Sequence, residues 1–493
     1  MNYKMLGRFI SMILAIETVS MIPALLISLF LHETSPVLGF LVAMGAAGVV
    51  SAILYVLSRG AGSDFYAREG MVCVGVSWVV LCLFGCIPFF VSGAIPNFLD
   101  ALFETVSGFT TTGSTIVQSP SSLPKGILYW RSFSHWLGGM GVLVFLLALV
   151  PVSGRNEGYT LHILRAESPG PSVGKLVPKM RQTAKVLYLI YVALTALNVI
   201  FLLCGRMSLF DSVCTAFGTA GTGGFGTKDD SIASFSPYIQ NVCTVFMLLF
   251  GINFSIFYLI LLGRIRSVFK DEELRFYLLT VFGSVGLIVW NLMQNNVYGG
   301  VGETVRHAFF QVASIITTTG YSTANYEIDW PAFSQAVLLI LMAVGACAGS
   351  TGGGLKCSRV VMLFKIMKRN IAEVMHPQKV KTVRLSGKPV PEKILANTNA
   401  YFAAYVLIAV ASFGLVSFDG FRMGSTFGLT ENLSAVLACF NNVGPGLGMI
   451  GPSSNFAGFG ILSKIVLIVD MLAGRLEIFP IIVLFSRQAW KRG

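Results

Sequence analysis

Hydrophobic residues occur along this chain in long, nearly uninterrupted runs, unlike the alternating or one-sided patterns of soluble strands and helices. Apolar runs of about 20 residues recur from residue 9 to residue 485, and a helix needs about 20 residues to cross ~30 Å of hydrocarbon. The pattern therefore indicates an all-α polytopic membrane protein embedded in a lipid bilayer. We predict spans near residues 9–31, 37–58, 71–93, 130–152, 183–204, 237–263, 275–294, 331–368, 395–417 and 456–486.

The composition supports this assignment, because only 12% of the 493 residues are charged, against about 25% in soluble domains. The first apolar run is longer than the core of a signal peptide and lacks a clear small-residue cleavage site, so we expect a retained span. The nine cysteines form no CxxC pair, and the five histidines are scattered without a recognisable catalytic or metal-binding arrangement. We therefore expect no enzymatic activity and no cofactor in this chain.

The charged residues divide the connections between spans into two kinds. Basic connections lie at 59–68, 153–185, 264–275, 365–393 and 487–493, whereas Gly- and Thr-rich connections that contain acids and few basic residues lie at 96–126, 205–236, 299–330 and 419–455. With the N-terminus on the basic side, 25 of the 35 Lys and Arg residues share that side and only 6 lie opposite. This asymmetry predicts that both termini are cytoplasmic. The net charge of +12 then reflects topology, and we expect no nucleic-acid binding.

The four acidic connections contain the same pattern. Each has a helix-forming stretch of 10–13 residues, too short to span a bilayer and suited to a re-entrant helix, followed by a Thr-, Asn- or Gly-rich turn. The turns, which we number as filter turns one to four, are TTTG (110–113), GTGG (221–224), TTTG (317–320) and NNVG (441–444). We predict four repeats of span, pore helix, filter and span around one pore, after an extra N-terminal helix pair. The expected boundaries are 1–68, 69–182, 183–270, 271–390 and 391–493.

Four converging turns of this kind can bind a cation without any fixed charge. Glycine permits backbone angles that direct successive carbonyls toward one axis, and rings of carbonyl oxygens can replace the hydration shell of a monovalent ion. The C-terminal ends of the short helices add negative potential. One such loop alone would more simply be a flexible connector or a helix-packing point, but four on the same side favour a filter. The expected cation ligands come from Thr111, Thr112, Gly113, Thr222, Gly223, Gly224, Thr318, Thr319, Gly320, Asn442, Val443 and Gly444.

These segments are where the chain resembles a known family. SGFTTTGST (107–115), GGFGT (223–227), TTTGYST (317–323) and FNNVGPGLG (440–448) are similar to the filter segments of TrkH/TrkG membrane subunits, which belong to the Trk/Ktr/HKT superfamily of potassium transporters. Further matches are RSFSHWLGGMGVLVF (131–145), GACAGSTGGGLKCSRV (345–360) and MLAGRLEIFP (471–480).

The resemblance implies potassium uptake across the bacterial inner membrane by a homodimer with one pore in each subunit. Potassium is then the substrate, and a TrkA-like cytoplasmic nucleotide-binding subunit is the regulatory partner. Gly113, Gly224, Gly320 and Gly444 match the potassium-selective pattern. Turn two departs from it, because Gly221 and Gly223 stand where turns one and three have Thr, and we expect this quarter of the filter to be looser.

A Gly-rich loop at 345–354 interrupts the predicted span 331–368, since five glycines in ten residues do not hold a straight helix. The resemblance suggests a gate below the filter, whereas a kinked helix packed closely on a neighbour is the alternative. Arg475 lies within the last predicted span, where an intramembrane charge is expected to be functional. Its alternative role is a structural ion pair with Glu477 or Asp470. The gate candidates are Gly345, Gly349, Ser350, Thr351, Gly352, Gly353, Gly354, Arg475 and Lys356, the last of which could instead snorkel to the surface.

Two rival functions remain open at this level. A proton- or sodium-coupled potassium symporter would need an ionisable group inside the membrane, and Glu17, Asp470 and Glu477 are the carboxylates of the predicted spans. A membrane enzyme or receptor would need a catalytic cluster or a sizeable domain outside the membrane, and the sequence pattern indicates neither.

Overall fold

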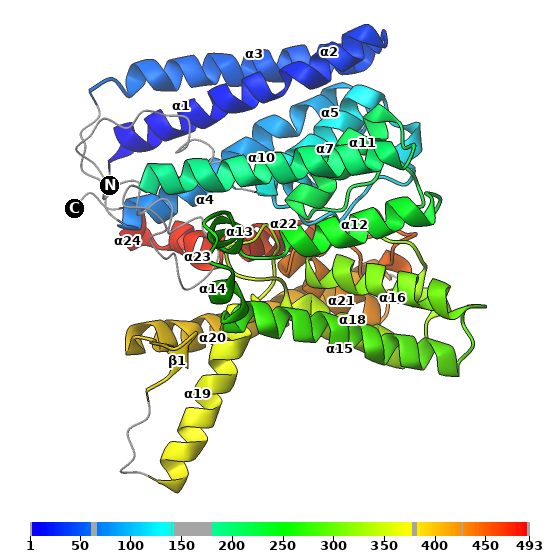
Figure 1. Cartoon of the computed structure of the whole chain (residues 1–493). Coiled ribbons are helices and arrows are strands. Elements are labelled where there is room, and N and C mark those ends of the chain that lie inside the picture. The colour runs from blue at the N-terminus through cyan, green and yellow to red at the C-terminus, as the bar shows by residue number, and fades with distance from the viewer. Residues whose placement is uncertain are drawn as a thin grey trace.

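The computed structural model describes residues 2–60, 67–139, 141, 180–376, 382–424 and 427–490. Long helices lying side by side make up most of it (Figure 1). Among the described residues, six helices are long and apolar enough to cross a membrane, or seven if one bent pair counts as a span. The chain is therefore a multi-pass membrane protein. One short hairpin, β1 (Arg384–Leu385) and β2 (Lys388–Pro389), joins two of the helices.

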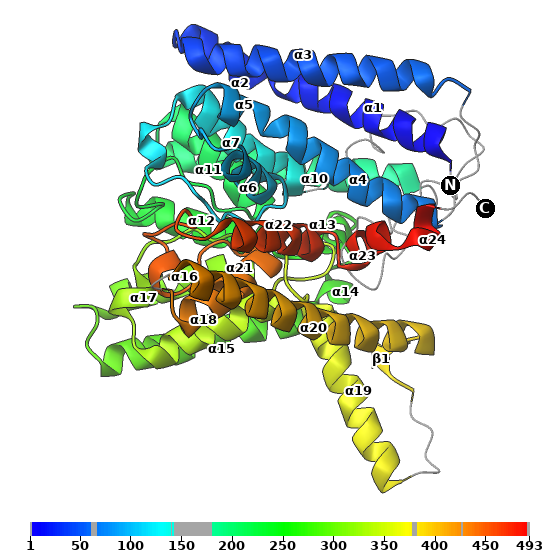
Figure 2. The ribbon, with the colours of Figure 1, turned by 180° about the vertical axis from the view of Figure 1, so that it is seen from behind.

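The predicted N-terminal helix pair forms one edge of the molecule (Figures 1 and 2). Its elements are α1 (Tyr3–Ser20), α2 (Ile22–Phe30) and α3 (Thr34–Leu57). Ser11 and Ser51 join α1 to α3 by donating to each other's backbone carbonyl oxygens at 2.8 and 2.7 Å. The pair packs on α4 (Ala67–Gly85) and α5 (Ile87–Val91), which correspond to the predicted span 71–93.

Four short helices occupy the interior of the remaining bundle, where the re-entrant pore helices are expected. They are α6 (Phe98–Phe109), α11 (Leu209–Gly221), α16 (Val301–Ile316) and α21 (Leu429–Phe440). The last three each follow a long helix. Helix α11 follows α10 (Met180–Cys204), α16 follows α15 (Glu272–Gln294), and α21 follows α20 (Glu392–Met423).

The four short helices, which we call pore helices after their predicted role, are packed in a closed circle. Each contacts the helix that follows it, namely α7 (Lys125–Gly139), α12 (Pro237–Phe250), α18 (Ala332–Val344) or α22 (Ile461–Arg475). Each also contacts the corresponding helix of the preceding unit, because α11 packs on α7, α16 on α12, α21 on α18 and α6 on α22. The last unit thereby closes on the first, and the ends of all four short helices are brought to one centre.

Two predicted spans are wrong as continuous helices. The span 237–263 is broken after α12, and α13 (Phe254–Leu261) continues at 90°. The span 456–486 is broken between α22 and α23 (Phe479–Phe485). The predicted interruption of 331–368 is confirmed, because non-helical chain separates α18 from α19 (Cys357–Met375). The predicted span 130–152 begins within α7, and most of its second half lies outside the described residues.

The break between α12 and α13 is stabilised by the Gly-rich loop. The N–H of Cys347 donates to the Gly251 carbonyl oxygen at 3.1 Å, and the N–H of Phe254 donates to the Gly349 carbonyl oxygen at 3.0 Å. Asn253 caps α13 by accepting from the Ser255 N–H at 2.9 Å. Non-helical backbone at membrane depth is tolerated only when its N–H and carbonyl groups are hydrogen-bonded to protein or water. These two segments provide such hydrogen bonds to each other.

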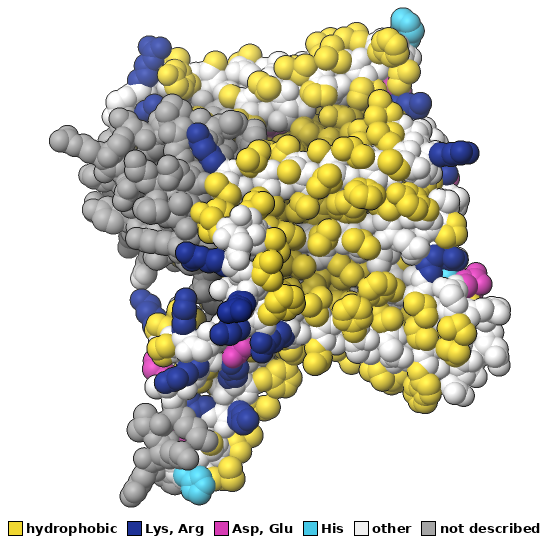
Figure 3. Space-filling view, in the orientation of Figure 1, with side chains coloured by type: hydrophobic (Ala, Val, Ile, Leu, Met, Phe, Trp, Pro, Cys, Tyr) yellow, Lys and Arg dark blue, Asp and Glu magenta, His cyan; other side chains and the backbone are white. Residues whose placement is uncertain are grey.

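Both described ends of the chain lie at the same end of the molecule. Tyr3 donates from its hydroxyl to the Trp490 carbonyl oxygen at 2.8 Å, which joins α1 to α24 (Arg487–Trp490). Lys and Arg side chains gather at this end over α14 (Ile265–Phe269), α19 and the hairpin, beside a hydrophobic band (Figure 3). The short α17 (Tyr326–Asp329) lies at the opposite end (Figure 2).

Candidate functional site

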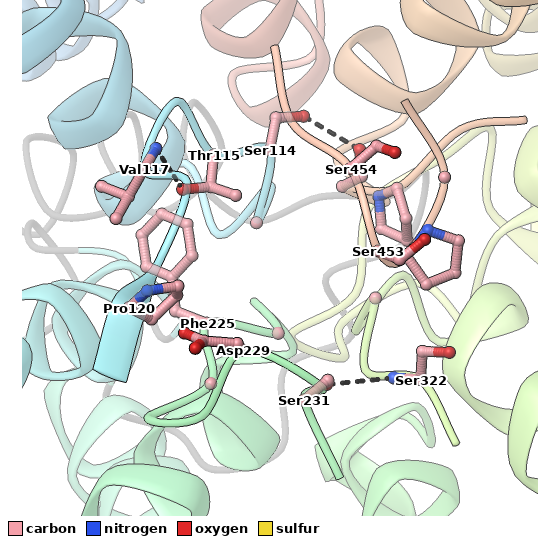
Figure 4. Close-up of a pocket in the computed structure, with 18 of the residues that line it drawn as sticks. Ser114, Thr115, Val117, Pro120, Phe225, Asp229, Ser231, Ser322, Ser453 and Ser454 are labelled. Carbon is pink, nitrogen blue, oxygen red and sulfur yellow. Dashed lines mark hydrogen bonds between the residues drawn. The ribbon is translucent and has the colours of Figure 1, made fainter. Parts of the chain in front are cut away.

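The four filter turns meet around one cavity, although they are separated by about a hundred residues from one to the next along the chain. Gly113, Gly224, Gly320 and Gly444 all line this cavity, which opens between segments of the four units (Figure 4). Its wall beyond the glycines combines apolar and charged residues with small polar side chains, which include Ser114, Ser322, Ser453 and Ser454.

All four pore helices end in the same hydrogen-bonded turn. An N–H one or two residues beyond the helix cap donates to the carbonyl oxygen five residues back. The pairs are Thr112 to Ser107, Gly223 to Gly218, Thr319 to Ser314 and Val443 to Ala438, at 2.8–2.9 Å. This is the Schellman motif, in which the residue just before that N–H is left-handed and is usually glycine. Here that residue is Thr111, Thr222, Thr318 or Asn442, with φ between 54° and 57°. A β-branched residue in this conformation is strained, and such strain is concentrated at functional sites.

The filter glycines repeat the left-handed conformation two residues later, with φ of 84°, 80°, 84° and 100° at Gly113, Gly224, Gly320 and Gly444. The residue between has negative φ in every turn. Because the sign of φ alternates, successive carbonyls turn to the same side of the chain, which only glycine permits at little cost. Each turn therefore has the alternating backbone conformation with which a chain can present successive carbonyl oxygens to one side.

Close packing between turns links them into a ring. A methyl group added to Gly113 would collide with the carbonyl oxygen of Gly223, one on Gly224 with that of Thr319, and one on Gly320 with that of Val443. The ring closes at Gly444, where an added methyl group would lie 2.7 Å from the Thr112 carbonyl oxygen. Each filter glycine thus makes room for the carbonyl of the next turn, and a side chain at any of them would displace it.

The pore helices orient their dipoles along the same centre. Each has an acid at its third position, which is Asp100, Asp211, Glu303 or Glu431. Acids there stabilise the positive N-terminal end of a helix. The partially negative C-terminal ends face the filter turns, where a cation would be favoured without a carboxylate ligand.

The Gly-rich loop lies directly against the filter, on the side away from the cavity. The N–H of Gly353 donates to the Thr318 hydroxyl oxygen at 2.7 Å. A methyl group at Gly352 would lie 2.9 Å from the Thr317 carbonyl oxygen. Lys356, which is 2% exposed, turns back into the loop and donates to the Gly352 carbonyl oxygen. The structure therefore brings the gate candidates of this loop together with filter turn three.

Arg475 joins this loop to α7. Its guanidinium donates to the Thr351 carbonyl oxygen at 2.7 Å, to the Gly139 carbonyl oxygen at 2.7 Å and to the Gly138 carbonyl oxygen. Glu477 pairs with Arg359, and Asp470 accepts from the Ser412 hydroxyl at 2.7 Å. Arg475 thereby links segments from three of the four units.

Glu273 is a contact of the loop that the sequence pattern does not reveal. It lies in the first turn of α15 and is 8% exposed. One carboxylate oxygen accepts from the Ala348 N–H at 2.6 Å and from the Ser358 N–H at 3.0 Å, and so holds chain on both sides of Lys356. In the sequence, Glu273 follows two other acids at a helix start, which is typical of simple capping.

A second missed feature is the ion pair of Arg131 and Glu104, both buried, at 2.6 Å. Glu104 accepts from the Ile116 N–H at 2.9 Å, and Arg131 donates to the Gly226 carbonyl oxygen at 3.0 Å. The pair therefore joins the segments that leave filter turns one and two. The sequence pattern places Arg131 merely among the few outer basic residues.

Two acids lie in different environments at the cavity: Asp229 lines it, and Glu327 contacts Ser453 of its wall. Hydrogen bonds from the side chain and N–H of Ser121 lower the pKa of Asp229, which is labelled in Figure 4. Those bonds measure 2.6 and 3.0 Å. Burial raises the pKa of Glu327, which accepts from the Ser453 hydroxyl at 3.1 Å. At neutral pH Asp229 therefore places a negative charge in the wall of the cavity.

Taken together, the fold and the site define a multi-pass helical membrane protein in which four short helices converge on one centre. Residues 40–491 match the family model described as TrkH, a cation transport protein. The chain belongs to this family. It is therefore a transport protein and not an enzyme.

Several characterised relatives match the chain over most or all of its length. The Trk system potassium uptake protein TrkH of Escherichia coli K12 is 35% identical, with 100% of both chains covered. The TrkG protein of the same strain, also a Trk system potassium uptake protein, is 32% identical over 96% of both. The crystal structure of the potassium transporter TrkH from Vibrio parahaemolyticus has a TM-score of 0.86 and 31% identity, with 100% of both chains covered.

Proposed function

We propose that this protein takes up potassium selectively through a filter of backbone carbonyls. The observation that carries the proposal is the ring of four turns, in which each filter glycine accommodates the carbonyl of the next. Relatives that share 30–35% of the sequence are named as potassium uptake proteins, which supports potassium as the substrate. No cofactor is needed for this function.

The filter would bind dehydrated potassium through oxygens of the residues predicted above, from Thr111–Gly113, Thr222–Gly224, Thr318–Gly320 and Asn442–Gly444. Carbonyl rings replace the hydration shell of a monovalent ion, and the ends of the four pore helices lower its energy further. The turns contain no carboxylate, which a divalent cation would require.

The Gly-rich loop and Arg475 form the gate in this proposal. The loop contacts the inner side of filter turn three, and Arg475 joins it to α7 through backbone carbonyls. A positive charge below a cation filter opposes passage of the ion. Opening then requires the loop to leave Thr318 and Arg475 to release Thr351.

The remaining parts of the proposal concern the assembly. We place the protein in the bacterial inner membrane with both termini in the cytoplasm, since the basic end carries both described chain ends. It would act as a homodimer with a TrkA-like cytoplasmic nucleotide-binding subunit that controls the gate. Its organisation would be a helix pair (1–68) and four repeats (69–182, 183–270, 271–390 and 391–493).

Ion flux into liposomes that contain the purified chain tests the proposal. Potassium and rubidium should pass, sodium and lithium should pass much more slowly, and a pH gradient should not drive uptake. Equal rates for all four ions would refute a selective filter.

The alternative is a proton- or sodium-coupled symporter. Glu17 is the first carboxylate to test for ion coupling, because it is buried and makes no hydrogen bond within the described residues. Flux that survives separate neutralisation of Glu17, Asp470 and Glu477 favours the uncoupled pathway. Flux that depends on one of them and on an ion gradient favours the symporter.

A further inference from the structure

Filter turn two lacks the side chains that brace turns one and three. In turn one the hydroxyls of Thr110 and Thr112 form a hydrogen bond of 2.8 Å. In turn three Thr317 and Thr319 form the corresponding bond at 2.7 Å. Both equivalent positions of turn two, residues 221 and 223, are glycine. The sequence alone therefore predicts a loose quarter of the filter.

His135 of α7 occupies the space of the missing side chains. A methyl group at Gly223 would collide with the Cγ, Nδ1 and Cδ2 atoms of its imidazole ring. A methyl group at Gly221 would collide with the His135 carbonyl group. The side chain is fully buried, and its ring lies 4.2 Å from that of Phe225, centroid to centroid. The two glycines thus admit one histidine from a neighbouring helix.

The hydrogen bonds of this ring assign its protonation. Nδ1 lies 2.7 Å from the Gly108 carbonyl oxygen, which can only accept, so Nδ1 carries the hydrogen. Nε2 accepts from the Phe225 N–H at 3.2 Å, so it carries none. His135 is therefore a neutral imidazole that connects the end of pore helix α6 to the chain just after filter turn two.

The bond to Phe225 acts on the filter through a single peptide plane. The N–H of Phe225 and the carbonyl of Gly224 belong to the same planar peptide group. A ring that fixes this N–H also fixes the direction of the Gly224 carbonyl, and Gly224 is the filter glycine of turn two. We propose that His135 is the positioning residue of filter turn two and sets its share of the preference for potassium over sodium. This inference rests on the proposed function.

Four variants separate the hydrogen bonds of the ring from its volume. His135→Gln keeps a donor and an acceptor, whereas His135→Phe keeps the volume and loses both bonds. Gly223→Thr introduces the residue of turns one and three while the ring is present. His135→Ala with Gly223→Thr removes the ring and restores that residue. Trp136→Phe is the matched control, because Trp136 lies on the same helix but donates to Thr195 of α10.

Each variant is purified as the full chain, its unfolding temperature is measured, and potassium and sodium fluxes are compared in liposomes. His135→Phe should lower the potassium-to-sodium flux ratio about fivefold or more, because the Phe225 N–H is left buried without a partner. His135→Gln should keep most of the ratio, and Trp136→Phe all of it. Gly223→Thr should either fail to fold or pass potassium and sodium at similar rates. The double variant should recover at least part of the wild-type potassium-to-sodium flux ratio.

Two outcomes would overturn the inference. One is a folded His135→Phe protein with the wild-type ratio, and the other is a Gly223→Thr protein that keeps the wild-type ratio with the histidine in place. A wild-type protein that passes potassium and sodium equally would instead refute the proposed function. The two failures are therefore distinguishable.

Discussion

The ring of filter glycines leads to a quantitative prediction for Gly320→Ala. Gly320 has φ of 84°, and an alanine there would have its methyl group against the Val443 carbonyl oxygen and 2.9 Å from Pro445 Cδ. Gly93 provides the matched control, because it has a similar φ of 73° and no described atom outside its chain neighbours lies within 4 Å of an added methyl group. The two substitutions share the backbone cost and differ only in the collision.

The expected energies follow from that difference. Left-handed backbone costs an alanine about 1–2 kcal/mol relative to glycine, and this cost applies at both positions. The collision at Gly320 adds about 1–3 kcal/mol of overpacking, or it is relieved when the Val443 carbonyl turns away. Loss of about 1.4 kcal/mol of discrimination corresponds to a tenfold change in the ion ratio. We therefore expect the potassium-to-sodium flux ratio to fall about tenfold in Gly320→Ala and to stay unchanged in Gly93→Ala.

The assay compares both proteins in liposomes at equal protein density, with the unfolding temperature of each measured in detergent. Both should be somewhat destabilised, but only Gly320→Ala should change the ratio. A folded Gly320→Ala protein with the wild-type ratio would refute the filter assignment. A similar fall in Gly93→Ala would show that general destabilisation, and not the ring, causes the effect.

Three further predictions concern the gate and the cavity wall. Arg475→Ala should raise basal potassium flux, because it removes the link between the Gly-rich loop and α7. Deletion of residues 348–352 should raise this flux further. Unchanged flux in both variants would contradict the gate assignment. Glu273→Ala should raise the open fraction about tenfold or more, since it removes two hydrogen bonds to the loop that contribute about 0.5–1.5 kcal/mol each, and about 1.4 kcal/mol corresponds to a factor of ten. Glu273→Gln should have a smaller effect; single-channel or flux recordings measure both. Because hydrogen bonds lower the pKa of Asp229, its contribution to the order of the cavity wall should be complete at neutral pH and lost only as the pH falls through that lowered pKa, below about 4. Hydrogen exchange at the Ser121 amide should follow this course and should be fast at pH 7 in Asp229→Asn; a midpoint near pH 6 would contradict the assignment.

The sequence predicts much of this fold because membrane helices and short pore helices differ in length. The spans at α3, α10, α15 and α20 follow from apolar runs of about 20 residues. The four short helices follow from their repeated pattern. The Gly-rich interruption after α18 is also visible, because glycine weakens a helix wherever it accumulates.

The broken spans are harder to predict. Residues 250–254 read Phe-Gly-Ile-Asn-Phe, and a single glycine in an apolar run does not require a break. The 90° bend depends on the loop at 347–351, which satisfies the freed backbone groups from about a hundred residues away. Such a compensation is a tertiary property that local pattern does not contain.

The candidate site shows the same division between local and tertiary information. The conformation of the four turns follows from local turn chemistry, since every turn carries a glycine two residues after its strained Thr or Asn. His135 and Glu273 act through contacts with backbone groups of distant segments. Their partners are backbone N–H and carbonyl groups, which nearly every residue possesses, so no sequence motif marks the contact.

The most direct test of the central claim is to locate the ion. Crystals of the full chain grown in rubidium or thallium salts would show these potassium substitutes by anomalous scattering. We predict peaks on the axis between the carbonyls of Thr112, Gly223, Thr319 and Val443. Peaks only outside this ring, or an equally strong effect of sodium in displacing them, would contradict a carbonyl filter selective for potassium.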